Sequence, residues 1–331
     1  MRIAEINDIA SVATELARGL RERGHEVDLL QPRLLGGGLP APVKPIVAPA
    51  RAFEWARVIR AVRRGRYDIA HIHYAYLGIL GVAGRFPYVL HCHGTDVRDP
   101  AAYTRPLVRR ALRGARRVLV ATPDLLDIVH GLRPDATFVP NPIDTETFAP
   151  RTPAEDARGV YLCSALSRIK GAPILLDACR RLADLRPDIG VTAIAGGELT
   201  PAFAELPNVH LLPRQPREAL PALINRHALV LGQMKLGLGM AELEAMACGR
   251  PVVMRFDYGD AYDAPPPVVR ALDGHDLAHE AIRLHDDKAG RARIGLESRD
   301  WVARVHALDR VAGQVERILE EALEDDALDV R

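Results

Sequence analysis

The sequence has no apolar run of the ~20 residues that a helix needs to cross a bilayer. Its first residues, M-R-I-A-E-I-N-D, hold no apolar segment of the kind found in secretory signals, so we expect no such signal. Cysteine is scarce and scattered, at Cys92, Cys163, Cys179 and Cys248, and forms no C-x-x-C pair. We therefore expect reduced, mostly buried thiols in a cytoplasmic protein, and neither disulfides nor a thiolate metal site.

The bulk composition is that of an ordinary globular protein. The 331 residues are 48% hydrophobic and 26% charged, which suits two domains of common size. The net charge of only +1 conceals an asymmetry. Residues 1–150 hold 21 Lys+Arg against 15 Asp+Glu, and residues 151–331 hold 23 against 28. The net charge is therefore positive in the first half and negative in the second, which suggests that the two halves have different partners.

The order of apolar patterns predicts two parallel sheets. In the first half, strand patterns at 2–6, 26–30, 69–73, 88–91, 117–121 and 137–139 alternate with helix patterns. Asn141-Pro142 interrupts this order, and the alternation resumes near residue 159. We predict an α/β fold of two Rossmann-like domains, with ligands outside the carboxyl ends of the strands. Residues 297–323 have the pattern of one continuous helix.

The stretch 237–253, G-L-G-M-A-E-L-E-A-M-A-C-G-R-P-V-V, predicts a glycine loop, a short helix and a buried strand. Gly237 and Gly239 let the backbone approach a ligand closely. The helix that begins near Met240 presents free N–H groups and the positive end of its dipole, which favours phosphate. An ordinary loop and helix packing unit has the same pattern, so this segment alone leaves both interpretations open.

Four segments in order resemble family 4 retaining glycosyltransferases. L-E-A-M-A-C-G-R-P-V-V is similar to the donor-site signature, and S-R-I-K-G at 167–171 to the diphosphate-binding element. H-C-H-G-T-D-V-R at 91–98 resembles the histidine loop of the acceptor domain, and V-P-N-P-I-D at 139–144 the junction between domains. The resemblance spans nearly the whole chain. It implies the glycosyltransferase B (GT-B) fold: an acceptor-binding domain (1–145) and a nucleotide-sugar domain (146–306) facing an interdomain cleft, with a C-terminal helix (307–331) packing back on the first domain.

The resemblance also implies which residues bind the donor. Lys170 would neutralise the departing diphosphate, and Glu244 would orient the ribose. The whole donor set is Arg168, Lys170, Gly171, Gly237, Gly239, Met240 and Glu244. Two positions depart from the family pattern. Ala165 stands where an arginine is usual, and Leu236 stands where the first glutamate of the signature is expected.

On the acceptor side, the candidate residues follow predicted strands. His93 follows the strand at 88–91 and is the catalytic candidate of the first domain, beside Lys170 and Glu244 in the second, because a histidine there can hydrogen-bond a sugar or the acceptor. Asn7, His73 and Asp96 are the acceptor-binding candidates, and Asp96 is also expected to organise its loop with Arg98. Several histidines together also suggest a metal ion, but no metal-binding spacing accompanies them, so we predict none.

Two arginine-rich segments mark the first half, a helix pattern at 53–64 and a run of arginines at 105–117. The one at 53–64 carries Phe53 and Trp55 near its start and Arg60, Arg63 and Arg64 near its end. Such a surface can dock on anionic lipid, although a solvated basic face explains it equally simply. Nucleic acid is a poorer fit, because no reading module is recognisable.

We therefore predict a hexosyltransferase-type enzyme that moves a sugar, with retention, from a nucleotide sugar to an acceptor hydroxyl without metal or other cofactor. The acceptor would be a glycan, a glycolipid or a small molecule, as in polysaccharide or glycolipid biosynthesis. The protein would be cytoplasmic, with possible peripheral contact with the inner face of the membrane. The alternatives are a sugar phosphorylase or synthase on the same fold, or a catalytically silent partner subunit.

Overall fold

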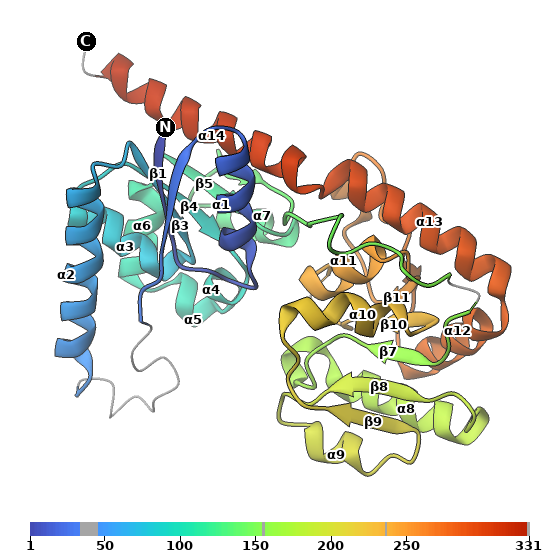
Figure 1. Cartoon of the computed structure of the whole chain (residues 1–331). Helices are drawn as coiled ribbons and strands as arrows, with labels where there is room; N and C mark the ends of the chain where they lie inside the picture. The colour runs from blue at the N-terminus through green and yellow to red at the C-terminus, as the bar shows by residue number, and fades with distance from the viewer. Residues whose placement is uncertain (34–45, 154–155, 236, 330–331) are drawn as a thin grey trace. The chain divides into compact units, whose positions relative to one another are not determined.

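The computed structural model describes residues 1–33, 46–153, 156–235 and 237–329. It divides into two compact units (Figure 1). Unit 1 comprises Met1–Pro142 and Leu308–Arg331, and unit 2 comprises Ile143–Ala307. Each unit is built on a six-stranded sheet in which every pairing is parallel, which confirms the predicted fold class. Among the described residues, no helix is both long and apolar enough to span a bilayer.

Unit 1 has the strand order β2-β1-β3-β4-β5-β6. Its strands are β1 (Arg2–Ile6), β2 (Glu26–Leu30), β3 (Ile69–His73), β4 (Tyr88–Cys92), β5 (Arg117–Val120) and β6 (Thr137–Phe138). Its helices are α1 (Val12–Glu22), α2 (Ala48–Gly65), α3 (Ile79–Gly84), α4 (Thr95–Arg98), α5 (Pro100–Tyr103), α6 (Pro106–Gly114), α7 (Asp124–Val129) and α14 (Leu308–Asp329). The central strands β3 and β4 are buried at every position.

Unit 2 has the order β12-β11-β10-β7-β8-β9. Its strands are β7 (Val160–Leu162), β8 (Val191–Ile194), β9 (Val209–Leu212), β10 (Leu229–Leu231), β11 (Val252–Met254) and β12 (Val269–Arg270). Its helices are α8 (Ala172–Leu185), α9 (Thr200–Ala204), α10 (Leu220–Asn225), α11 (Met240–Ala247), α12 (Gly274–Asp286) and α13 (Lys288–Val305). Two apolar clusters, one containing Leu162, Leu175 and Leu277 and the other Val230, Met246 and Trp301, form its core.

Strand order indicates where a ligand would bind in each unit. In such sheets, ligands bind beyond the carboxyl ends of the strands where the order reverses direction. In unit 1 this point lies between β1 and β3, and in unit 2 it lies between β7 and β10. The segments that follow these four strands contain Asn7, Tyr74, Lys170 and Gln233.

Helix α14 closes unit 1 by packing on α1. A Cβ atom added to Gly19 would lie 2.8 Å from the Cβ of Ala312, so the two helices approach too closely for a larger residue at position 19. Glu316 on α14 then accepts hydrogen bonds from Arg23 at 2.7 Å and contacts Nε2 of His25 at 2.6 Å. A segment distant in sequence is thereby fixed to the first β-α unit.

The continuous helix predicted for residues 297–323 is wrong. Helix α13 ends at Val305 and α14 begins at Leu308. The interruption has a hydrogen-bonding cause, because the carbonyl of His306 accepts from the backbone N–H of Ile143 at 2.7 Å instead of continuing the helix. Apolar periodicity runs through this break, so the sequence pattern did not reveal it.

Candidate active site

A histidine cluster forms at the carboxyl end of the unit 1 sheet. The pairing of β1 with β3 sets Glu5 beside His71, and the pairing of β3 with β4 sets His73 beside His91. Because side chains alternate along a strand, His71 and His73 share one face. His93 lies one residue beyond β4. The sheet register therefore gathers four imidazoles around one carboxylate.

Glu5 is the centre of this cluster, and the sequence interpretation missed it. Its side chain is completely buried, and its two oxygens take different partners. Oε1 lies 3.0 Å from Nδ1 of His71, and Oε2 lies 2.6 Å from Nε2 of His73. The other nitrogen of His73, Nδ1, lies 2.9 Å from Nε2 of His93. A line of hydrogen bonds thus runs from Glu5 through His73 to His93.

The electrostatics of the cluster favour an ionised Glu5. Burial alone would raise the pKa of Glu5, but the charge of His71 and the hydrogen bonds from His71 and His73 outweigh it and lower this pKa to about 2. Burial lowers the pKa of His73, and it holds the pKa values of His91 and His93 well below their ordinary value. At neutral pH the cluster therefore contains an ionised Glu5 beside neutral His73, His91 and His93.

The loop that carries His93 is fixed by Asp96. This buried carboxylate accepts hydrogen bonds from the backbone N–H groups of Ala75 at 2.8 Å, Gly94 at 2.7 Å and His93 at 3.1 Å. Asp96 organises the loop as expected, but without Arg98, whose guanidinium pairs instead with Asp124 at 2.6 Å. Because the Asp96 carboxylate already accepts hydrogen bonds from three backbone N–H groups, its role in this structure is to fix the conformation of the loop.

The loop between β1 and α1 has an unusual backbone. Asn7, Ala10 and Ser11 adopt positive φ angles of 71°, 52° and 67°, which non-glycine residues rarely take. Asn7 also donates through Nδ2 to the carbonyl of His73 at 3.1 Å, so it is tied to the histidine cluster. The left-handed backbone of Ala10 and Ser11 delays the start of α1 until Val12.

The cluster offers a metal ion fewer ligands than its histidine count suggests. His71, His73 and His91 bring ring nitrogens within 4.8 Å of one another. Both nitrogens of His73, however, already have partners in Glu5 and His93. Nε2 of His71 and the two nitrogens of His91 are buried without a hydrogen-bond partner among the described residues.

In unit 2, the Lys170 loop and the glycine loop meet at the switch point of the sheet. Nζ of Lys170 donates to Oε1 of Gln233 at 3.1 Å, and the carbonyl of Lys170 accepts from the N–H of Met234 at 2.9 Å. Gly171 has a φ of +84°, and a Cβ atom there would lie 2.7 Å from the Cβ of Met234. The approach of these loops therefore requires glycine at position 171.

Glu242 and Glu244 lie two residues apart on α11 and have different interaction partners. Glu242 accepts hydrogen bonds from the N–H groups of Gln233 at 2.9 Å and Gly239 at 3.0 Å, which clamps both ends of the glycine loop. This role was missed, although Glu at the third helical position is the known signal of a capping box. Leu236, in the same loop, lies outside the described residues.

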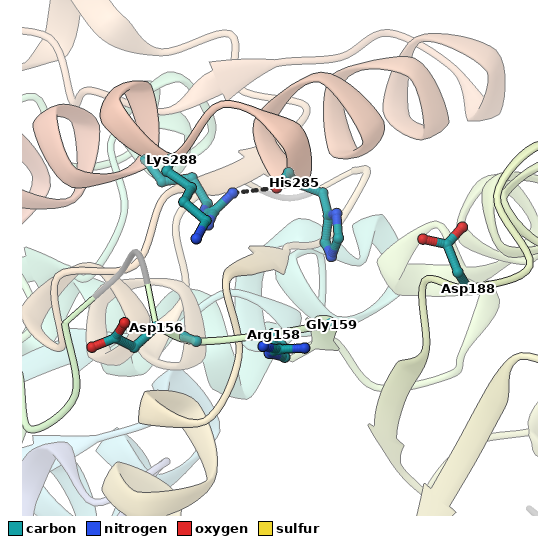
Figure 2. Close-up of a pocket in the computed structure, with 8 residues that line it drawn as sticks. Asp156, Arg158, Gly159, Asp188, His285 and Lys288 are labelled. Atoms are coloured by element: carbon teal, nitrogen blue, oxygen red, sulfur yellow. Dashed lines mark hydrogen bonds between the residues drawn. The ribbon is translucent and has the colours of Figure 1, made fainter.

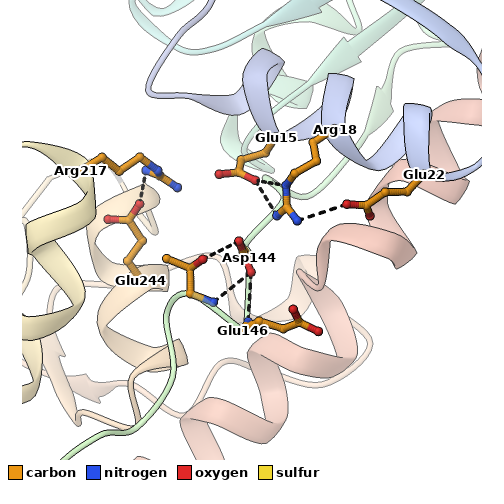
Figure 3. Close-up of polar contacts among 8 residues, drawn as sticks. Glu15, Arg18, Glu22, Asp144, Glu146, Arg217 and Glu244 are labelled. Atoms are coloured by element: carbon orange, nitrogen blue, oxygen red, sulfur yellow. Dashed lines mark hydrogen bonds and ion pairs between the residues drawn. The ribbon is translucent and has the colours of Figure 1, made fainter.

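Glu244 is buried and ion-paired with Arg217, a residue that the sequence interpretation did not consider. Oε1 of Glu244 lies 2.5 Å from Nη1 of Arg217 (Figure 3). The guanidinium of Arg217 also lies over the ring of Phe148, 5.1 Å from its centre. Arg217 comes five residues after β9, so it belongs to the same carboxyl edge as Lys170. The backbone N–H of Arg168 is held by Glu198 at 2.7 Å.

A separate pocket of about 550 Å³ lies at the opposite, amino edge of the unit 2 sheet (Figure 2). Asp156, Arg158, Asp188, His285 and Lys288 are among its lining residues, so its charges are mixed. None of the predicted donor residues lines it. Its position and charge give no support for a nucleotide site.

Comparisons with known proteins agree with the four motifs. The family model described as Glycosyltransferase Family 4 matches residues 9–147, and the model described as Glycosyl transferases group 1 matches residues 157–287. The chain belongs to the family 4 glycosyltransferases. It is 23% identical to N-acetyl-alpha-D-glucosaminyl L-malate synthase of Bacillus anthracis, over 95% of this chain and 94% of that protein.

Further relatives support the same family. The chain is 27% identical to D-inositol 3-phosphate glycosyltransferase of Pseudarthrobacter chlorophenolicus, over 85% of this chain and 82% of that protein. Its fold is similar to that of Anabaena HepE in complex with UDP-glucose, with a TM-score of 0.74, 16% identity, and coverage of 97% of this chain and 100% of that chain. This glycosyltransferase therefore has the GT-B type of fold.

Proposed function

We propose that this glycosyltransferase takes its sugar from a nucleotide sugar and passes it, with retention and without a metal, to an acceptor hydroxyl. The observation that carries this proposal is the meeting of the Lys170 loop and the glycine loop at the switch point of unit 2. That point faces the N-terminus of α11, whose N–H groups favour phosphate.

In this proposal, unit 2 stabilises the leaving group. As the bond from the anomeric carbon to the diphosphate breaks, negative charge develops on the phosphate oxygens. Lys170 and the N-terminus of α11 would neutralise that charge, which is the task a metal ion performs in other transferases. Glu244, held by Arg217, would orient the ribose. Arg217 would also supply a guanidinium at the edge where Ala165 replaces the usual arginine.

Unit 1 would then bind the acceptor and the sugar near His93. The new bond forms between the acceptor oxygen and the anomeric carbon as the bond to the diphosphate breaks, and the proton of the acceptor hydroxyl passes to the departing diphosphate. His93 is partly exposed, unlike the other histidines of the cluster, so it is the one that substrate can contact. Asn7 and His73 would support this surface from behind.

The decisive experiment is a thermal-shift screen of the full chain against UDP-, GDP-, ADP-, TDP- and CMP-sugars, beginning with UDP-glucose because the similar HepE binds it. The correct donor should raise the melting temperature, because a ligand at a hundredfold excess over its dissociation constant adds about 2.7 kcal/mol to the free energy of unfolding. Release of nucleoside diphosphate with an acceptor present, unaffected by EDTA, should follow. A chain that no nucleotide sugar stabilises would contradict the proposal.

A further inference from the structure

Glu5 determines where two hydrogens of the histidine cluster lie. An ionised carboxylate only accepts hydrogen bonds, so each ring nitrogen that it contacts must carry a hydrogen. These nitrogens are Nδ1 of His71 and Nε2 of His73. With a pKa of about 2, Glu5 is ionised at neutral pH.

The same reasoning extends from His73 to His93. Burial keeps the pKa of His73 below its ordinary value, so the neutral ring has a single hydrogen, and Glu5 requires it on Nε2. Nδ1 of His73 is therefore an acceptor, and the hydrogen in its 2.9 Å contact must come from Nε2 of His93. Since His93 is also neutral, its Nδ1 has only a lone pair.

We propose that Glu5 and His73 are positioning residues that hold His93 in the Nε2–H tautomer, so that Nδ1 of His93 accepts a hydrogen bond from a substrate hydroxyl. This inference rests on the proposed function and narrows its substrate. The group facing His93 must donate a hydrogen, as a sugar hydroxyl does. A phosphate, a carboxylate or an ether at that place would meet a lone pair and be rejected.

The surrounding loop supports this assignment. Asp96 holds the backbone N–H of His93, so the ring is presented from a fixed loop. Among the described residues, no group hydrogen-bonds to Nδ1 of His93, whereas Nε2 has its partner in His73. Nδ1 of His93 is therefore available to a substrate, and Nε2 is linked to Glu5 through His73.

Long-range ¹H–¹⁵N NMR spectra of the histidine-labelled full chain test the proposal without any substrate. We expect His73 and His93 to carry hydrogen on Nε2 at neutral pH, with signals assigned by single-histidine variants. A hydrogen on Nδ1 of His93 would overturn the proposal. Shifts typical of metal coordination at His73, together with stoichiometric metal in the purified protein, would overturn it as well.

The variant Glu5→Gln tests the positioning role. Its amide can donate to Nε2 of His73, which releases the tautomers of His73 and His93. We expect mixed tautomers at His93 and kcat at least ten-fold lower. His71→Gln disturbs the other oxygen of Glu5 and is the matched control, expected to keep the Nε2–H tautomer of His93. If Glu5→Gln does not fold, His73→Gln gives the same tautomer readout. A native tautomer with native kcat in a folded Glu5→Gln variant contradicts the proposal.

Substrate analogues complete the test. Replacing the sugar hydroxyls one at a time by fluorine, which cannot donate, should reduce turnover more than ten-fold at one position, and His93→Ala should lose this discrimination. Equal turnover of all analogues by the native enzyme would overturn the assignment of Nδ1. If the native chain turns over no nucleotide sugar, the proposed function fails, while the spectra still decide the tautomer.

Discussion

Lys170 is the residue whose role in donor binding is tested most directly. Its ammonium now contacts Gln233, and a bound diphosphate would offer a stronger, charge-assisted partner. Lys170→Ala should weaken nucleotide binding by about 1.5–3 kcal/mol, measured by calorimetry. Lys288→Ala, at the amino edge of the same unit, is the control and should leave the affinity unchanged. Equal affinities for both variants would refute the donor site.

His93 should matter for turnover more than for folding. The residue is partly exposed and its loop is held by Asp96 through the backbone, so His93→Ala leaves the loop anchored. We expect a melting temperature within a few degrees of the native value and a loss of most transfer activity. Full activity of this variant would mean that another histidine faces the substrate.

Ala10 and Ser11 hold a backbone conformation that costs a non-glycine residue about 1–2 kcal/mol. Glycine relieves that strain but adds entropy to the unfolded chain, so Ala10→Gly or Ser11→Gly should each stabilise the protein by about 0.5–1 kcal/mol. Ala13→Gly, in the right-handed first turn of α1, should instead destabilise it by about 1 kcal/mol. Urea unfolding measures all three, and destabilisation by both loop variants would show that these positions are not strained.

At the scale of elements, the docking of α14 on α1 should depend on pH. Burial alone would raise the pKa of Glu316, but hydrogen bonds with His25 and Arg23 lower it below 4.5 in the folded state. A carboxyl group whose pKa is lower in the folded than in the unfolded protein stabilises the folded state at pH values above its unfolded pKa. For Glu316 this contribution is lost as the pH falls below about 4.5. Glu316→Gln should therefore cost about 1 kcal/mol at pH 7 and much less at pH 3, as measured by urea unfolding. An equal cost at both pH values would argue against the ion pair.

The strands were predicted nearly to the residue, because buried parallel strands are short apolar runs between turn signals. The β4 strand and the candidates His93, Lys170 and Glu244 follow from such local patterns. Glu5 and Arg217 do not, since their importance comes from partners in other strands and loops. Glu5 becomes visible only when β3 is known to pair with β1, which no local pattern states.

At the scale of the whole molecule, the charge asymmetry leads to a prediction about membranes. Helix α2 exposes Arg60, Arg63 and Arg64, and Phe53 on the same helix is 75% exposed, whereas Trp55 packs against Tyr76. Binding to anionic vesicles should be weak and lost at high salt, because exposed charges are screened within ~8 Å at physiological ionic strength. Each arginine should contribute about 1 kcal/mol, so replacing all three with glutamine should abolish co-sedimentation.

The control replaces Arg180, Arg293 and Arg304, which are exposed on unit 2, and should leave vesicle binding unchanged. Neither triple variant should alter nucleotide binding. If the native protein stays in the supernatant at low salt, the arginines form an ordinary solvated surface, and a water-soluble acceptor becomes the better hypothesis.

Unit 1 is assembled from two separate stretches of chain, Met1–Pro142 and Leu308–Arg331, with all of unit 2 between them. Its first stretch therefore leaves the ribosome long before α14 exists. At translation rates of about 5–20 residues per second, the roughly 300 residues between α1 and the end of α14 take on the order of fifteen to sixty seconds, during which the surface of α1 around Gly19 stays uncovered. Unit 2, being continuous, can fold within that interval. We infer that unit 1 is the last to mature during synthesis, and that a stalled or prematurely terminated nascent chain would carry a folded unit 2 and an incomplete unit 1 whose exposed apolar surface binds chaperones.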